Sequence, residues 1–229
     1  MNSKKLQENL ASNFSFDFTK DQKDVVESIS DFSSSISTRD IFLLKGYAGT
    51  GKTSLISALV KSLPSIGKRS VLLAPTGRAA KVLSKYSNKQ ASTIHRKIYW
   101  IRTRKNGNTY IKIKENTHSN TVFIVDEASM IPEATDKSFG NRSLLDDLIQ
   151  YVYDGIGCKL VLIGDTAQLP PVHLDISPAL NESFLNQAYS KEIISFTMKE
   201  VVRQEEDSTV LLNATHLRNK LDAEDYSFP

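Results

Sequence analysis

The chain has 229 residues, of which 40% are hydrophobic and 24% charged, so it can bury a sizeable core as one large domain or as a domain with an insertion. No apolar run approaches the ~20 residues of a membrane span, the first residues do not form a signal peptide, and a lone cysteine, Cys158, excludes a disulfide framework. The formal net charge of +3 permits a nucleic-acid partner but does not argue for one. These features predict a soluble, cytoplasmic protein whose cysteine lies in the core.

A helix is expected to begin just after Thr19. The sequence Thr19-Lys20-Asp21-Gln22 has the capping-box pattern, in which the threonine and glutamine side chains each bond the other residue's backbone N–H. The residues that follow place an apolar stripe on one face of this helix: Val25, Val26, Ile29 and Phe32. The serine-rich stretch at 33 to 37 is expected to form a loop.

The stretch GYAGTGKTS, residues 46 to 54, fits the phosphate-binding pattern G-x-x-x-x-G-K-[ST] and follows a strand-like apolar run, Ile41 to Leu44. Glycines let backbone N–H groups surround phosphates, the lysine adds a positive charge, and the following helix adds its dipole. A plain glycine-rich turn is the alternative, although this pattern arises by chance in only roughly one chain of this length in a hundred. The expected ligands of a nucleoside triphosphate are Gly46, Gly49, Thr50, Gly51, Lys52, Thr53 and Ser54, with the Thr53 hydroxyl also binding Mg²⁺.

Further apolar runs alternate with helix-like segments along the chain. Strands are expected at Val71 to Ala74, Val122 to Val125 and Leu160 to Ile163, and a helix at Ser143 to Tyr153 with its apolar residues on one face. This alternation predicts an α/β fold with a central, mostly parallel sheet flanked by helices.

One segment, residues 99 to 116, interrupts the alternation. Asn106-Gly107 lies at its middle with β-branched or aromatic residues on both sides, which predicts a β-hairpin. The hairpin is basic, which suits either contact with a phosphate backbone or solvated lysines that protect the hairpin's edges. Its basic residues are Arg102, Arg104, Lys105, Lys112 and Lys114.

Two strands are followed by residues suited to phosphate chemistry. Asp126 and Glu127 end the run VFIV, where an aspartate can hold Mg²⁺ through water and a glutamate can orient or deprotonate an attacking water. An acidic pair at the start of a helix is the structural alternative. Gln168 follows the last strand in GDTAQLPPV and is expected to sense the γ-phosphate by hydrogen bonding; a rigid proline turn is the alternative there.

The order of these motifs resembles superfamily 1 DNA helicases of the RecD-like, 5′-to-3′ branch, over roughly residues 16 to 204. FTKDQ resembles the adenine-reading Q motif, GYAGTGKTS motif I, LLAPTGRAA motif Ia, STIHR the next DNA-contacting motif, VDEASM motif II, GDTAQLPPV motif III and VVRQ motif IV. Several short motifs in order are far more specific than any one alone. The resemblance implies a RecA-like P-loop NTPase that uses ATP and Mg²⁺.

Roles for single residues follow from this resemblance. Gln22 would read the adenine edge, a role that can coexist with its place in the capping box. Lys52 and Thr53 would serve the phosphates and Mg²⁺, and Asp126 with Glu127 would form the hydrolytic pair. Gln168 and Arg203 would face the γ-phosphate, so Lys52, Glu127, Gln168 and Arg203 are the expected catalytic residues, although Arg203 in so short a motif could equally be a surface arginine.

The resemblance also implies contacts with single-stranded DNA, mostly at phosphates. The matching positions are Pro75, Thr76, Arg78, Thr93 and His95. Taken singly, Thr76 suits a helix N-cap and His95 suits a packed or surface histidine. RNA is the less favoured substrate.

The expected organisation is a first RecA-like domain in two parts, 1–96 and 118–229, with the basic hairpin inserted at 97–117. RecD-like helicases carry a small insertion here that can act as a duplex-splitting pin, with Tyr99, Trp100 and Tyr110 available for stacking. A last helix is expected at Val210 to Leu217. No second RecA-like domain follows Arg203, which fits either a chain cut before that domain or a shortened natural product.

Without the arginine of that second domain, phosphoryl transfer is typically slower by roughly a thousandfold or more, so this chain alone is expected to bind nucleotide with little hydrolysis. A monomer is favoured, and no membrane partner is expected. Two functions from other classes stay open. One is a remodelling ATPase of the AAA+ type, although the sequence GDTAQLPPV fits poorly the sensor motif that such an ATPase needs. The other is a nucleotide-dependent binding module without motor activity.

Overall fold

A computed structural model describes residues 2–103, 109–132, 143–165, 168 and 177–202. Arg203, the Asn106-Gly107 turn and the helix expected at 210–217 lie outside the described residues. Among the described helices, none is long and apolar enough to cross a membrane.

The core of the protein is a six-stranded sheet in which every strand pairing is parallel. Its strands, in spatial order, are β3 (Ala91–Thr93), β2 (Arg69–Ala74), β6 (Thr121–Val125), β7 (Lys159–Gly164), β1 (Asp40–Gly46) and β8 (Glu192–Met198). The predicted α/β fold and the strands expected from apolar runs are confirmed. The two edge strands β3 and β8 were not predicted, because neither has the continuous apolar run of a strand covered on both faces.

The central strands are apolar throughout because both faces of the sheet are covered. Successive side chains of a strand point to opposite faces, so Ile41 and Leu43 enter one core cluster while Phe42 and Leu44 enter the other. Strands β6 and β7 divide in the same way. This double coverage holds the strands themselves between two apolar layers.

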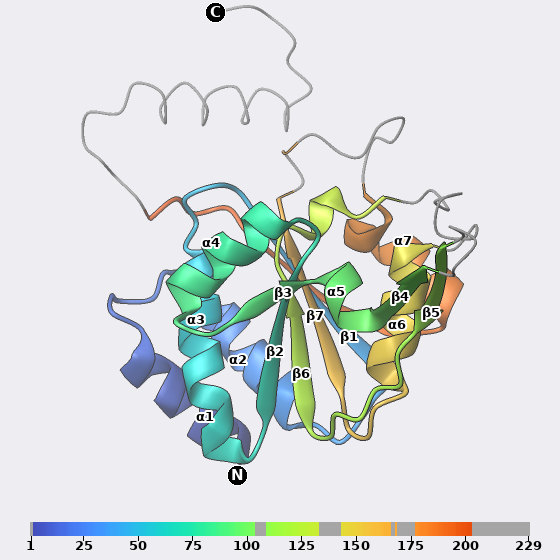
Figure 1. Cartoon of the computed structure of the whole chain (residues 1–229). Coiled ribbons are helices and arrows are strands. Elements are labelled where there is room, and N and C mark those ends of the chain that lie inside the picture. Colours follow the sequence, from blue (N-terminus) through green and yellow to red (C-terminus); the bar gives the residue numbers. More distant parts are fainter. Residues whose placement is uncertain (1, 104–108, 133–142, 166–167, 169–176, 203–229) are drawn as a thin grey trace, which may run out of the picture.

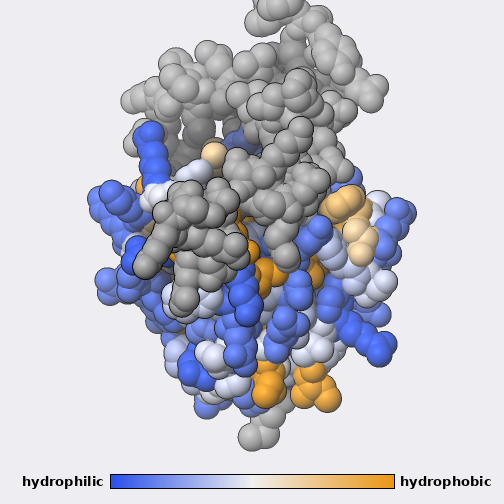
Figure 2. Space-filling view, turned by 45° about the vertical axis from the view of Figure 1, so that its right-hand side comes forward, coloured by the Kyte–Doolittle hydropathy of each residue, from blue (hydrophilic) through white to orange (hydrophobic). Residues whose placement is uncertain are grey.

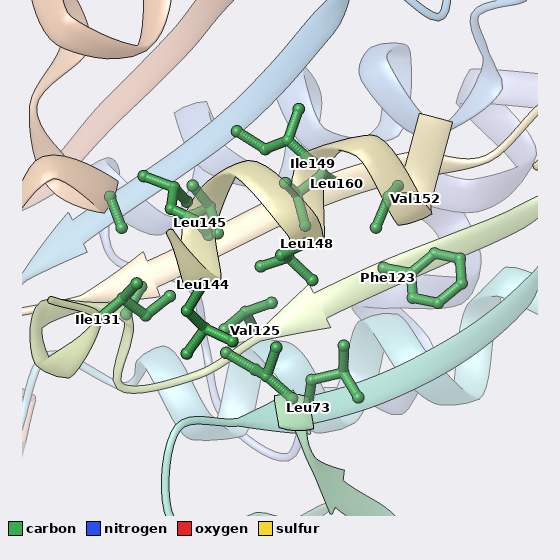
Figure 3. Close-up of a cluster of buried hydrophobic side chains, with 14 of the residues drawn as sticks. Leu73, Phe123, Val125, Ile131, Leu144, Leu145, Leu148, Ile149, Val152 and Leu160 are labelled. Atoms are coloured by element: carbon green, nitrogen blue, oxygen red, sulfur yellow. The ribbon is translucent and has the colours of Figure 1, made fainter. Parts of the chain in front are cut away.

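One face carries α5 (Ile94–Ile98), α6 (Leu144–Tyr153) and α7 (Glu182–Tyr189), on the right in Figure 1. The predicted helix at 143–153 is confirmed, with the Ser143 hydroxyl capping it by accepting from the Asp146 N–H. Its apolar stripe packs on the sheet beside Leu73, Phe123 and Val125 (Figure 3). Cys158 is buried in the same cluster, as predicted.

The opposite face, on the left in Figure 1, carries α1 (Asn2–Asn13), α2 (Lys20–Ser34), α3 (Lys52–Ser62) and α4 (Gly77–Ser87), with a 3-10 turn, η1 (Leu63–Ile66), after α3. The Thr19–Gln22 capping box is present in both directions. The loop expected at 33 to 37 begins two residues late, because α2 continues through Ser34 and Ser33 is buried within the helix.

The predicted hairpin is confirmed: β4 (Tyr99–Thr103) pairs antiparallel with β5 (Thr109–Ile113). Its base belongs to the core of the domain, since Tyr99 is buried there and its hydroxyl donates to Asp147 Oδ2 at 2.7 Å. Ile111 and Ile113 pack against the same cluster. The described residues in the view of Figure 2 are mainly hydrophilic with a few hydrophobic areas, and Trp100 and Ile101 of β4 are more than half exposed.

Candidate nucleotide-binding site

A cleft of about 600 Å³ opens at the edge of the sheet where the strands end, which we call the carboxyl edge. Three neighbouring strands, β6, β7 and β1, deliver their following loops to this edge, as expected for a ligand site in a parallel sheet. The cleft therefore gathers motifs that are far apart in sequence. It is lined by Gln22, Gly49, Gly51, Lys52, Thr53, Ser54, Asp126, Glu127, Gln168 and Val202, among others.

The loop between β1 and α3 has the backbone of a phosphate cradle. Gly49 and Gly51 have φ of 84° and 89°, a left-handed conformation that costs glycine little. Helix α3 begins at Lys52, so its first N–H groups and dipole face the cleft. Lys52 Nζ donates to the carbonyls of Gly46 at 2.5 Å and Tyr47 at 2.7 Å, which keeps its ammonium group within the loop.

These features fit a triphosphate with its metal. Thr53 and Ser54 lie in the first turn of α3 and line the cleft together with Asp126, so hydroxyl and carboxylate oxygens, the kind of ligand that Mg²⁺ prefers, face the same cleft. Gly46 and Thr50 lie behind the cleft lining: Thr50 is buried, and its hydroxyl donates to the Tyr47 carbonyl at 2.9 Å. The bond of Thr50 lies within the loop between β1 and α3 and stabilises its conformation.

The acidic pair occupies a strained turn at the end of β6. Glu127 has φ 57° and ψ 37°, a left-handed conformation that is uncommon for a residue with a side chain. Its N–H donates to Asp126 Oδ1 at 3.0 Å, which fixes the aspartate. Burial, and next the nearby Glu127 charge, raise the pKa of Asp126 to about 6. A bound cation would relieve both effects, which is consistent with a metal ligand at Asp126.

Gln168 lies beside the turn that carries Glu127. The turn continues into a short 3-10 helix, η2 (Ala128–Met130), and the Ser129 hydroxyl contacts Gln168 Oε1 at 3.5 Å. The Ser177 hydroxyl, just before η4 (Pro178–Leu180), donates to the carbonyls of Ala128 and Ile131, which ties the chain after β7 to the same turn. Ser129 was missed by sequence reasoning, because a serine after an acidic pair has no pattern of its own.

The chain after β8 also reaches this site. Val202 N–H donates to the Gly49 carbonyl at 3.0 Å, and the N–H groups of Lys199 and Glu200 donate to Asp21 Oδ2. Val202 also lines the cleft. Two aromatic residues of the connector between α1 and α2, Phe14 and Phe16, line the cleft as well and were not predicted. The aromatic-rich spelling FSFDF was the signal that could have indicated them.

The candidate DNA-contacting residues gather at the same edge, beyond β6. Strands β2 and β3 are paired so that Ala74 lies opposite Thr93, and this brings residues 75–78 next to residues 93–95. The hydroxyls of Thr76 and Thr93 both cap helices, accepting from the N–H groups of Ala79 and Arg96. The structural alternative for Thr76 is thus observed. His95 is partly buried with its ring 5.7 Å from that of Tyr99, and Arg78 is exposed.

A basic hollow of about 390 Å³ lies between α5 and the chain that follows β5. Lys97 Nζ lies 2.8 Å from His118 Nε2, and Lys114 Nζ donates to the Arg96 carbonyl while lying 4.8 Å from the centre of the Trp100 ring. Burial, followed by the charge of Lys114, lowers the pKa of Lys97. Glu115 is the acidic residue in the lining, and among the described residues no salt bridge joins it to the lysines of the hollow. The hollow therefore suits an anion.

Comparison with known proteins places the chain in a family. It matches the family described as "AAA domain" over residues 17–226. The chain belongs to this family.

The relatives of this AAA domain include helicases. It is 31% identical over 180 residues to the ATP-dependent DNA helicase dda of Enterobacteria phage T4, which covers 77% of this chain and 37% of that protein. It is 33% identical over 132 residues to the ATP-dependent RecD2 DNA helicase of Deinococcus radiodurans, covering 58% of this chain and 16% of the relative. The resemblance to RecD-like superfamily 1 helicases is thereby confirmed.

The fold agrees with a solved helicase structure. The crystal structure of Pif1 helicase from Bacteroides, in complex with ADP-AlF3 and ssDNA, superposes with a TM-score of 0.53 at 17% identity, covering 93% of this chain and 48% of that one. At this identity the likeness supports the fold. The chain spans less than half the length of all three of these proteins.

Proposed function

We propose that this AAA domain is the ATP-binding motor domain of a RecD-like DNA helicase, which couples ATP hydrolysis to movement along single-stranded DNA in a complete enzyme. The observation that carries this proposal is the meeting of the phosphate cradle, the Asp126–Glu127 pair and Gln168 in one cleft. A glycine-rich turn alone would not bring a strained acidic turn and a glutamine to its open side.

Each residue of the cleft has a role in this proposal. The first turn of α3 and Lys52 hold the β- and γ-phosphates, while Thr53 and Asp126 hold Mg²⁺. Bound Mg²⁺ supplies positive charge that offsets the charge developing on the phosphoryl oxygens. Glu127, fixed in its left-handed turn, orients the attacking water and accepts its proton. Gln168, next to Ser129, senses whether the γ-phosphate is present, and Arg203 is proposed to reach it from the end of Val202.

Single-stranded DNA is proposed to cross the carboxyl edge over residues 75–78 and 93–95. Because the two threonine hydroxyls cap helices, their contribution is to place the first backbone N–H groups of α4 and the Arg78 side chain beside the strand. The basic hollow at Lys97 and Lys114 would extend this track towards the hairpin. The hairpin's role as a pin, and the division of the domain at 97–117, remain proposals.

The second candidate is a nucleotide-dependent binding module without motor activity. It would use the same cleft for nucleotide, and the chain spans only 37% and 16% of the two helicases whose motor activity it would otherwise share. The AAA+ remodelling alternative is weaker, since the curated relatives reported above are helicases.

The experiment that separates these functions is steady-state ATP hydrolysis with and without a single-stranded DNA oligonucleotide, in the wild-type chain and in Glu127→Gln, alongside a nucleotide-binding titration. We expect nucleotide binding in both proteins and slow wild-type turnover that DNA raises. In Glu127→Gln, ATP turnover should fall by about a hundredfold or more, because the variant loses the carboxylate that orients the attacking water and accepts its proton in the transition state. Binding with no response to DNA would favour the binding module, and no binding would refute both.

A further inference from the structure

Acidic and basic residues are segregated along the chain, although its net charge is small. Residues 41–114 contain 16 lysines and arginines and no aspartate or glutamate. All 26 acidic residues therefore lie in the rest of the chain, whereas an even spread would place about eight of them in this stretch. The formal net charge of +3 thus hides a strongly basic segment beside an acidic remainder.

The nucleotide-binding cleft explains only part of this segregation. Acidic side chains around the P-loop would repel a triphosphate, but the stretch runs on from α3 through β2, α4 and β3 to the hairpin. Strands β3 and β2 form one edge of the sheet, and α4 packs on both of them (Figure 1). On the same face, α2 packs on β1 and β8 and carries Asp24, Glu27 and Asp31 as exposed residues. The basic character therefore belongs to one side of the domain.

The outward face of α4 carries a row of cations. Arg78, Lys81 and Lys85 are exposed, and at about 100° per residue they point within about 60° of one another, over about 10 Å of helix axis. The buried residues of the helix lie on its opposite side. Tyr86 points towards α3 instead, where it lines a pocket of about 260 Å³. The row therefore presents positive charge without an aromatic ring among its members.

These cations are not neutralised within the part of the chain that the structure describes. None of Arg78, Lys81 and Lys85 forms a salt bridge with a described residue, and neither α3 nor α4 contains an acidic residue. Lys81 and Lys85 are four residues apart, so their charges repel each other on the helix surface. Such a row costs stability in the free protein, and a polyanion that lies along it would offset this cost.

The phosphate backbone of a DNA duplex fits this row better than a single strand does. Proteins that hold single strands combine cations with aromatic rings on which the bases stack. In a duplex the bases already stack on each other, and the outside offers one negative charge per about 1.7 Å of axis. A row of charges on a convex helix can meet this backbone without reaching any base.

We propose that Lys81 and Lys85, continuing the row from Arg78, bind the phosphate backbone of double-stranded DNA beside the single-strand track. This deepens the proposed function and rests on it, because Arg78 begins the row at the carboxyl edge, where the single strand is proposed to cross residues 75–78. The duplex thus meets the domain next to its single-stranded continuation. Binding is independent of base sequence, since only phosphates are contacted.

The test is a pair of titrations followed by fluorescence anisotropy, one with a blunt DNA duplex and one with an oligothymidine single strand, each repeated over a range of salt concentrations. In the double variant Lys81→Ala, Lys85→Ala we expect duplex affinity to fall about tenfold near 0.1 M salt. The slope of log affinity against log salt should become shallower by about 2, because two phosphate contacts are lost. Single-strand affinity should stay at the wild-type value.

The outcomes separate this proposal from the proposed function. An unchanged duplex affinity in the double variant, or an equal loss for both probes, would overturn the assignment of these lysines to a duplex. A wild-type chain that binds the single strand but not the duplex would also overturn it and would leave the single-strand track standing. If the wild type binds neither probe, the proposed DNA function fails and this inference fails with it.

Two matched variants control for net charge and for folding. Lys4→Ala, Lys5→Ala removes the same charge from exposed positions on α1 and should leave the preference for the α4 row visible; a loss equal to that of the α4 pair would contradict a located surface. Lys81→Arg, Lys85→Arg keeps both charges and should bind the duplex like the wild type. Thermal unfolding should show no destabilisation of the alanine pair, because alanine favours helix and the repulsion between the lysines is removed.

Discussion

The two edges of the sheet differ in where their polar side chains lie. At the edge where the strands begin, which we call the amino edge, polar side chains close on neighbouring carbonyls: Lys159 Nζ donates to Ser37 O, and Asn116 Nδ2 donates to Tyr151 O at 2.7 Å. At the carboxyl edge, the P-loop, Asp126 and Gln168 line an open cleft instead. Both edges have the same sheet behind them, so the difference lies in the loops.

Residues other than glycine adopt left-handed conformations at both edges, but with different consequences. Asn120 at the amino edge and Glu127 at the carboxyl edge both adopt a left-handed conformation, with φ of 47° and 57°. Asparagine tolerates this conformation, whereas glutamate pays more for it. At the carboxyl edge this costly conformation places an acidic side chain beside the phosphate cradle, whereas at the amino edge Ser190, with φ of 50°, ends α7 before β8.

The largest effect is expected from Asp126→Asn at the carboxyl edge. Removing the carboxylate should reduce the Mg²⁺-dependent part of ATP affinity by about ten- to a hundredfold, as for other residues that hold a metal directly or through water. The measurement is an ATP titration with Mg²⁺ and again with a chelator. An unchanged Mg²⁺ dependence would show that Asp126 does not serve the metal.

At the amino edge, Asn116→Ala should act on stability instead. The substitution leaves the buried carbonyls of Tyr151 and Val152 without their amide partner, at a cost of about 2 kcal/mol in the free energy of unfolding. Urea unfolding measures this cost, and ATP affinity should stay at the wild-type value. A fall in ATP affinity in the still-folded variant would break the division between the edges.

A third prediction concerns the basic hollow. The double variant Lys97→Ala, Lys114→Ala should lower affinity for single-stranded DNA by about tenfold near 0.1 M salt and flatten its salt dependence, since two phosphate contacts are lost. The control is Lys4→Ala, Lys5→Ala, which removes the same charge from exposed positions on α1. Equal losses in both pairs would mean that net charge alone, and no located track, governs binding.

The smallest effect belongs to Lys159. Burial lowers the pKa of Lys159 from 10.5 to about 8. Between these pH values the unfolded chain holds the proton more often than the folded chain, so the free energy of unfolding should rise with pH across this window. We expect Lys159→Met to reduce that rise by about 1 kcal/mol, measured by urea unfolding from pH 7 to 10. Parallel pH profiles for the two proteins would contradict this.

Much of the fold could be predicted because its signals are local. The runs at 41–44 and 160–163 are apolar on both faces, and Thr19–Gln22 encodes a helix start in four residues. Strand β3 escaped prediction because Ala-Ser-Thr carries no such signal and is a strand only through its pairing with β2. Local pattern cannot report a pairing partner.

The residues of the candidate site also fall into two groups, those that local sequence predicts and those that it does not. The P-loop and the acidic pair were predictable, since their chemistry requires fixed residue types at fixed spacing. Ser129, Phe16 and the second bond of Gln22 were not, because each depends on a contact between separate loops. The Gln22 side chain shows this most clearly: its capping box can be read from the sequence, but its bond to Thr50 across 28 residues cannot.

The central claim is that the carboxyl-edge cleft binds a nucleoside triphosphate through its P-loop. It is tested most directly by titrating ATP with Mg²⁺ into the wild-type chain and Lys52→Ala, with thermal unfolding as the check that both are folded. We predict saturable binding by the wild type and an affinity lower by about a hundredfold or more in the variant, as expected when a charge that pairs with phosphate is removed. Equal affinity in two folded proteins would contradict the claim.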